Sequence, residues 1–154
     1  MAASTISPPG AEDAMLHRAF CRSAGRLIAF LEHNRGGNSD GEKLKFPYSR
    51  LFPQNCCEGV SAIFSILLAE KYGLKDVAII RGTDPGPYEH HFWVRAGGRI
   101  YDLTAQQFGG LEPVFGALEH PLAVKFSDQT ERGETDAVDR DEIIALYHRD
   151  IIPF

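Results

Sequence analysis

The most informative part of the sequence is QNCCEGVSAIFSILLAEKYG, residues 54–73. Its apolar side chains recur at helical spacing, and the run ends at Gly73, a residue type that commonly terminates helices. The pattern predicts a helix over residues 58–72 that begins directly after Cys56 and Cys57. Unpaired N–H groups at a helix N-terminus carry partial positive charge, so a thiolate at this position is stabilised.

Adjacent cysteines in this chain have two interpretations. The sequence holds three cysteines, Cys21, Cys56 and Cys57, which are too few for a disulfide framework, and neighbouring cysteines do not easily bridge. We therefore expect reduced thiols. Such thiols more often act as small buried hydrophobes than as nucleophiles. A catalytic interpretation requires a base near the thiol and a third group that holds the base in the right tautomer.

A predicted β-hairpin around Gly97-Gly98 supplies such a pair. The runs on both sides are β-prone, and a Gly-Gly connection is a strong hairpin signal. Counting outward from the turn pairs Trp93 with Asp102, so His91 and Asp102 are diagonal neighbours on one face. Diagonal positions lie roughly 7–8 Å apart, a gap that an imidazole and a carboxylate can close with one hydrogen bond.

The alternation of side chains along a strand separates the two neighbouring histidines. His90 is expected on the face of Tyr101, opposite to His91, so His91 is the predicted base. Trp93, the only tryptophan, shares the His91 face. We expect Trp93 to contribute to the substrate site or to shield the hydrogen bond of His91 from water, with a packing role in the core as an equal alternative.

The remaining elements follow from periodicity and from turn residues. We expect a first helix over 11–33, a loop over 38–55, a buried strand over 77–80 with a loop over 82–88, and hairpin strands over 91–95 and 99–103. Further along the chain the pattern predicts a strand near 122–126, an exposed loop over 127–140 and a terminal helix over 141–150.

A zinc site is the competing chemical interpretation of Cys56, Cys57, His90 and His91, because thiolates and imidazoles bind zinc. Paired zinc ligands are usually separated by two to four residues, whereas the side chains of adjacent residues diverge. We therefore expect no metal. The sequence also lacks P-loop, dinucleotide-binding and zincin motifs, and we expect no cofactor.

Three segments in chain order carry a family resemblance: FPQNCCEGVS at 52–61, HFWV at 91–94 and YDLTAQQF at 101–108. Together they resemble bacterial proteins of the transglutaminase-like, papain-fold superfamily, and the resemblance covers 52–108. It implies an α+β fold with a papain-like, transglutaminase-like core. In such a core a central helix starts at the cysteine and packs on an antiparallel sheet, and the histidine and the aspartate lie on successive strands.

The same resemblance implies roles for individual residues. Cys57 corresponds to the nucleophile, His91 to the base and Asp102 to the orienting acid. Papain-like enzymes also use a side-chain donor, often glutamine, to stabilise the oxyanion, and Gln54 and Asn55 are the candidates. The sequence departs from the family pattern after Cys57, where the small and acidic residues are reversed, and after His91, where a small residue is common.

The predicted function is thiol-dependent acyl transfer on amide bonds, with a protein or peptide as substrate. If water accepts the acyl group, the enzyme is a peptidase, amidase or deamidase. If an amine accepts it, the enzyme is a transglutaminase or acyltransferase. A non-catalytic protein-binding domain on the same fold is the alternative from a different class.

Composition limits the remaining possibilities. The 154 residues, 44% of them hydrophobic, suit a single catalytic domain over 11–154 behind a flexible arm over 1–10. A net charge of -5 gives no reason to expect a nucleic-acid partner. The longest apolar run, 60–69, is about half the roughly 20 residues of a membrane span. With no secretion signal at the N-terminus, we expect cytoplasmic residence, with signal-independent export as the alternative.

Overall fold

The computed structural model describes residues 10–35, 44–133 and 135–154. They form an α+β fold, so the predicted class is confirmed. The arm predicted over 1–10 lies, apart from its last residue, outside the described residues. The elements are helices α1 (Ala11–Asn34), α2 (Cys57–Tyr72) and α3 (Arg140–His148), strands β1 (Val77–Asp84), β2 (Glu89–Ala96), β3 (Arg99–Asp102), β4 (Val114–Ala117) and β5 (Asp128–Arg132), and 3-10 turns η2 (Ser49–Leu51) and η3 (Ala105–Gln107).

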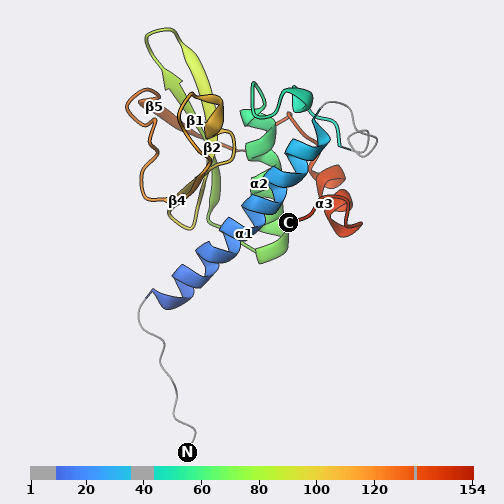
Figure 1. The fold of residues 1–154 in the computed structure, drawn as a ribbon. Helices are drawn as coiled ribbons and strands as arrows, with labels where there is room; N and C mark the ends of the chain where they lie inside the picture. The colour runs from blue at the N-terminus through green and yellow to red at the C-terminus, as the bar shows by residue number, and fades with distance from the viewer. Residues whose placement is uncertain (1–9, 36–43, 134) are drawn as a thin grey trace, which may run out of the picture.

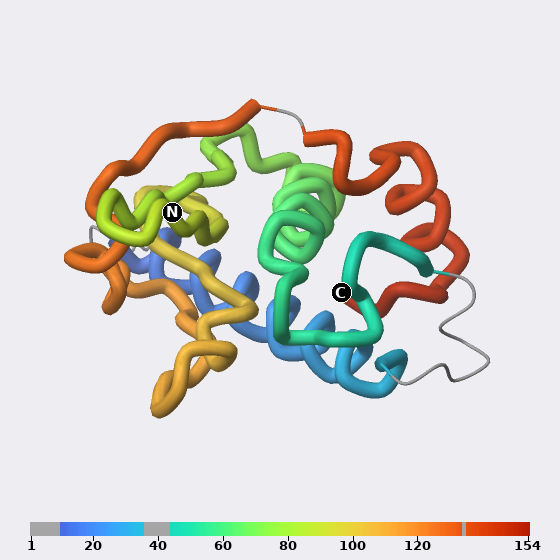
Figure 2. Tube along the Cα trace, turned by 90° about the horizontal axis from the view of Figure 1, so that it is seen from above, coloured from blue at the N-terminus to red at the C-terminus, as the bar shows by residue number. Residues whose placement is uncertain are grey.

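The five strands make one antiparallel sheet in the order β4-β3-β2-β1-β5. Helix α2 lies between this sheet and α3, and α1 crosses beside α2 (Figure 1). Viewed nearly down its axis in Figure 2, α2 occupies the middle of the molecule, with strands on one side and α3 on the other. Within the described residues, no helix combines the length and the apolar character needed to cross a bilayer.

Helix α2 is central because it is apolar around most of its circumference, and such helices are buried on all sides. Its start and end agree with the predicted helix, and Gly73 ends it in the left-handed conformation (φ 63°). The main core combines residues from all three helices and the sheet: Phe20, Leu27, Val60, Phe64, Leu67, Val94, Tyr101, Ile143 and Leu146.

The hairpin of β2 and β3 has the predicted register. Val94 pairs with Tyr101, and Ala96 pairs with Arg99. Gly97 and Gly98 both have positive φ, 56° and 77°, as a tight two-residue turn requires. The register prediction is therefore confirmed, and with it the alternation that separates neighbouring side chains on β2.

Two predictions for the C-terminal half are wrong. Residues 122–126 form turns, and the strand is β5, inside the segment predicted as a loop. The side chains of β5 are almost all exposed, because it is an edge strand held by backbone pairing with β1. A polar edge strand carries no apolar alternation, so periodicity does not find it. Pairing on both sides also extends β1 to Asp84, beyond the predicted end at residue 80.

Helix α1 runs to Asn34, close to the predicted end at residue 33, and its predicted glycine stop at 36–37 lies outside the described residues. Met15, predicted on the apolar face, is 62% exposed. The helix instead buries His17 and Ser23 among its apolar residues.

Candidate active site

The two neighbouring cysteines have different surroundings at the start of α2. Cys56 caps the helix and is buried in the main core. Burial, and secondarily the adjacent Cys57, raises the pKa of the Cys56 thiol to about 12. Cys57 is the first residue of α2, is partly exposed, and packs against Ala62, Ile79 and Phe92. Only Cys57 combines access to solvent with the first turn of the helix, where N–H groups lack intrahelical partners.

His91 on β2 and Asp102 at the end of β3 form a buried pair. His91 donates its Nε2–H to Asp102 Oδ2 over 2.6 Å, and His91 is 0% exposed. The second carboxylate oxygen, Oδ1, accepts hydrogen bonds from the backbone N–H of Thr104 at 3.0 Å and from its hydroxyl at 3.3 Å. Both oxygens of Asp102 are therefore fixed, and the carboxylate holds His91 in one orientation.

The other imidazole nitrogen of His91 has side-chain neighbours only. The Gln107 amide nitrogen lies 3.4 Å from Nδ1, and the Cys57 thiol contributes to the pKa of the imidazole. Burial, the largest single effect, lowers the pKa of His91. The hydrogen bonds and charges of Asp102 and Cys57 together outweigh burial and raise that pKa to about 9. The arrangement leaves Nδ1 as the nitrogen that can exchange a proton with the thiol.

Asp102 is ionised in this site. Burial is the largest effect and raises the pKa of the carboxyl, but hydrogen bonds and charges from His120 and His91 outweigh it and lower the pKa to about 2. A carboxylate that accepts several hydrogen bonds is stabilised in its charged form. Asp102 therefore carries the negative charge that stabilises a protonated His91.

His120 is the site residue that the sequence did not indicate. It donates its Nε2–H to Asp102 Oδ2 over 2.7 Å, and its Nδ1 accepts the backbone N–H of Leu122 over 2.9 Å. The residue lies in the turns after β4, where no strand alternation predicts a direction for its side chain. Thr104 and Gln107 were also missed, although they follow Asp102 within the segment that carries the resemblance.

A cluster of His91, Asp102 and His120 is also a possible metal-ligand group. Its distances argue against an ion. Two ligands that each lie about 2.1 Å from a tetrahedral zinc stand about 3.4 Å apart, whereas the nitrogen–oxygen separations here are 2.6 and 2.7 Å. These are hydrogen-bond lengths, and each Nε2 carries the proton it donates.

The zinc set considered from the sequence is not assembled either. Cys56 lies in the apolar core, and His90 Nδ1 hydrogen-bonds with the Thr83 hydroxyl over 2.9 Å. Consistent with strand alternation, His90 points away from His91, and its ring contacts Tyr88. Among the described residues, Cys56, Cys57, His90 and His91 do not form a metal-ligand group.

The three predicted accessory residues differ in position. The Gln54 amide donates to the backbone carbonyl of Gln107 over 3.4 Å, which ties the loop before α2 to the turn after β3. Asn55 is exposed beside it, with a positive φ of 58°. Trp93 is 1% exposed and packs on the imidazoles of His91 and His120, a position that suits the shielding and packing roles; its role in a substrate site stays a prediction. Gly82, which pairs with His91 on β1, leaves space for the indole, because an added Cβ there would lie 2.5 Å from the Trp93 ring.

Aromatic rings cover the imidazoles. The centroids of Phe108, Phe126 and Trp93 lie 4.9, 5.5 and 5.8 Å from that of His91, and Trp93 lies 4.4 Å from His120. Rings at these distances exclude water from the hydrogen bonds to Asp102, and electrostatic interactions are stronger in such surroundings.

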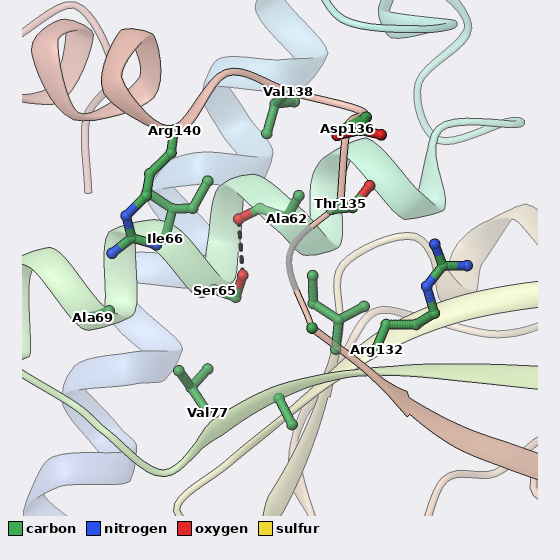
Figure 3. A pocket seen from close by; sticks show the side chains of 13 residues that line it. Ala62, Ser65, Ile66, Ala69, Val77, Arg132, Thr135, Asp136, Val138 and Arg140 are labelled. Atoms are coloured by element: carbon green, nitrogen blue, oxygen red, sulfur yellow. Dashed lines mark hydrogen bonds between the residues drawn. The ribbon is translucent and has the colours of Figure 1, made fainter.

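A cavity of about 420 Å³ lies beside the site, between α2, the start of β1 and the segment that leads into α3 (Figure 3). Cys57, His91 and Asp102 do not line it. Its walls include Ala62 and Ile79, two members of the apolar cluster against which Cys57 packs. Arg132 and Arg140 stand at its edge in Figure 3.

No family model, curated protein or solved structure matches this chain. The function is therefore argued from the site itself: a partly exposed thiol at a helix N-terminus, a buried imidazole beside it, and an ionised carboxylate fixed on both oxygens.

Proposed function

We propose that this chain is a thiol-dependent acyl-transfer enzyme of the transglutaminase-like, papain-fold type. In this proposal Cys57 is the nucleophile, His91 the general base and acid, and Asp102 the orienting acid. The observation that carries it is the pair of interactions at the His91 imidazole. Its Nε2–H donates to Asp102 Oδ2 over 2.6 Å, and the Cys57 thiol contributes to raising its pKa. The helix that begins at Cys57 and packs on an antiparallel sheet supports the same assignment.

The chemistry begins with transfer of the Cys57 thiol proton to His91 Nδ1. The thiolate attacks an amide carbon, and a carbon–sulfur bond forms as the carbonyl electron pair moves to oxygen. N–H groups of the first turn of α2 lack intrahelical partners and can donate to that oxyanion. The His91 imidazolium then protonates the departing amine as the carbon–nitrogen bond breaks, leaving a thioester on Cys57.

The second half of the reaction restores the thiol. His91 removes a proton from water or from an amine, which attacks the thioester and displaces the Cys57 sulfur, and the sulfur recovers a proton from His91. Asp102 keeps its charge throughout and stabilises the imidazolium. Hydrolysis of protein or peptide amides is the activity we propose first, because partial exposure of Cys57 gives water access. An amine acceptor gives transamidation by the same steps.

The proposal is tested by trapping the thioester. The protein is incubated with p-nitrophenyl acetate, release of p-nitrophenol is followed, and the acylated residue is located by mass spectrometry. We expect acetyl transfer to Cys57 and a loss of turnover on the order of 10³-fold in Cys57→Ala and in His91→Ala.

Matched controls come from the neighbouring residues. Cys56→Ala and His90→Ala are expected to retain most of the activity, because Cys56 lies in the core and His90 points away from His91. Unchanged turnover in Cys57→Ala, or equal losses in all four variants, would contradict the proposal. Peptides that contain glutamine, with and without dansylcadaverine, then distinguish hydrolysis from amine transfer by ammonia release and dye incorporation.

A further inference from the structure

We propose that His120 is a positioning residue: its Nε2–H shares Oδ2 of Asp102 with His91 and thereby weakens the hydrogen bond that Asp102 accepts from His91. Its catalytic meaning rests on the proposed function. The hydrogen bonds from His120 and His91 to Asp102 do not rest on the proposed function. The hydrogen bonds and the enzymatic activity can therefore be tested separately.

The tautomer of His120 follows from its two hydrogen bonds. Its Nδ1 lies 2.9 Å from the backbone nitrogen of Leu122, and a backbone N–H can only donate, so Nδ1 must be the unprotonated nitrogen. The proton of a neutral imidazole is then on Nε2, where it is donated to Asp102 Oδ2 over 2.7 Å. A second proton on Nδ1 would face the N–H of Leu122 in a residue that is 5% exposed. The two hydrogen bonds therefore fix the tautomer of His120, with its proton on Nε2.

The two imidazoles on Asp102 differ at their second nitrogen. Nδ1 of His120 is occupied by a backbone N–H, whereas Nδ1 of His91 meets only the side-chain amide of Gln107, over 3.4 Å. A side-chain amide can turn or move away when the imidazole takes up a proton, but a backbone N–H in a turn cannot. Nδ1 of His91 therefore has a partner that can move, whereas Nδ1 of His120 is held by the backbone.

Asp102 divides its hydrogen-bonding capacity between the two rings. Oδ2 accepts from both Nε2 atoms, and each donor to a carboxylate lowers its basicity. Oδ1 is held independently by Thr104, so removal of His120 leaves the carboxylate in place with one donor fewer. Its remaining bond to His91 then strengthens. The titratable groups that face His91 are Asp102, His120 and Cys57. The substitutions used in the test below change only His120.

The ring of His120 is also fixed from the side. The Trp93 indole lies 4.4 Å from it, centroid to centroid, with the planes 35° apart. Trp93 in turn fills the space that Gly82 leaves open on β1, where an added Cβ would come within 2.5 Å of the indole. Strands β1 and β2 thus hold the ring that His120 packs against, and the imidazole cannot turn away from Asp102 without losing this contact.

The experiment is a ¹⁵N NMR titration of the imidazoles in the full chain, with no substrate present. In the wild type we expect the ¹⁵N shifts of His120 to report a proton on Nε2 and an Nδ1 that accepts a hydrogen bond. In His120→Leu the pKa of His91 is expected to rise by about half a unit or more, as loss of one competing donor implies. His120→Gln places an amide N–H near the former Nε2 and is expected to keep the wild-type value.

His120→Asn serves as a second loss-of-donor variant should His120→Leu fail to fold, because its amide is too short to reach Oδ2. It is expected to raise the pKa of His91 as His120→Leu does. A purely structural role for His120 would lower stability without raising this pKa. A proton on Nδ1 of His120 in place of Nε2, or an unchanged or lower pKa of His91 in both loss-of-donor variants, would overturn the inference. If acyl transfer is absent but the titration pattern is as expected, only the proposed enzymatic function is refuted.

Discussion

Tyr101 and Asp102 are neighbours on β3, yet they point to opposite faces of the sheet and each meets a buried histidine. Tyr101 hydrogen-bonds with His17 of α1, and Asp102 with His91 of β2. On the Tyr101 side, the second nitrogen of His17 faces the carbonyl of Gly97 at 3.3 Å, so both ring nitrogens have structural partners. On the Asp102 side, His91 keeps one nitrogen for side chains.

This difference separates a structural pair from a reactive one. Burial and a hydrogen-bonded histidine are common to both clusters and do not identify an active site. A nitrogen left accessible to a thiol, opposite a fixed carboxylate, is present only at His91. The His17–Tyr101 pair instead connects α1 to the sheet within the main core, where Phe20 packs against both rings.

The largest expected effect comes from Asp102→Asn, compared with Tyr101→Phe. An asparagine carries no charge, and its NH2 group must face donors either at Thr104 or at the two Nε2–H groups, so His91 loses its fixed orientation and its stabilised charged form. We expect turnover of the activated ester to fall on the order of 10³- to 10⁴-fold. Tyr101→Phe is expected to keep activity within about twofold and to lose about 1–2 kcal/mol of unfolding free energy, measured with urea. Similar losses of activity in both would remove the distinction.

The pH dependence of stability is the second prediction. Asp102 has its pKa lowered from 3.8 to about 2, so its contribution is present above about pH 4 and is lost as the pH falls towards 2. His91 has its pKa raised from 6.5 to about 9, so its contribution is complete below about pH 6.5 and is lost as the pH rises towards 9. Urea unfolding from pH 2 to 9 should show both losses.

The matched variants sharpen this test. Asp102→Asn should reduce both pH-dependent losses of unfolding free energy, since it removes one titrating group and the main partner of the other. Tyr101→Phe should retain both. A wild-type profile that rises between pH 6.5 and 9 would mean that His91 is more basic in the unfolded chain than in the native protein, contrary to the prediction.

A smaller effect distinguishes two glycines, one beside each cluster. An added Cβ at Gly82 would meet the Trp93 ring at 2.5 Å, and one at Gly116 would meet the Tyr101 hydroxyl at 3.3 Å in a backbone with φ 75°. Both alanine variants are expected to lose about 1–3 kcal/mol of stability. Only Gly82→Ala should also change the alkylation rate of Cys57, because Trp93 packs on the imidazoles.

The smallest effect is expected from Gln107→Ala. The amide of Gln107 approaches His91 Nδ1 only at 3.4 Å, a long hydrogen bond, and the imidazole keeps its bond to Asp102. Activity should change by about fivefold or less. A loss comparable with that of Asp102→Asn would show that Gln107, and not the carboxylate, holds His91 in place.

Local patterns predicted the parts of the site that lie in regular structure. Helical periodicity located the start of α2 and hence Cys57, and the Gly-Gly turn fixed the register that puts His91 and Asp102 on one face. These inferences depend on repeats of two residues in strands and of about 3.6 residues in helices, which the sequence displays directly.

The remaining parts depend on tertiary contacts. His120 lies among turns, where no periodicity gives the direction of a side chain, and it reaches Asp102 only because the chain after β4 folds back over the sheet. Trp93 shares a face with His91 as predicted, but the turns that contain Phe126 cover that face and bury it. Strand β5 carries no apolar alternation and is positioned by backbone pairing with β1.

The central claim is that Cys57 is activated by His91 and Asp102. The most direct test is the rate of iodoacetamide alkylation at each cysteine between about pH 5 and pH 9, mapped by mass spectrometry. An activated thiol reacts well below the ordinary thiol pKa of about 8.5. We expect Cys57 to be alkylated far faster than Cys21 and Cys56 near pH 6, and this advantage to disappear in His91→Ala. Alkylation of Cys57 that rises only around pH 8.5, unaffected by loss of His91, would contradict the account.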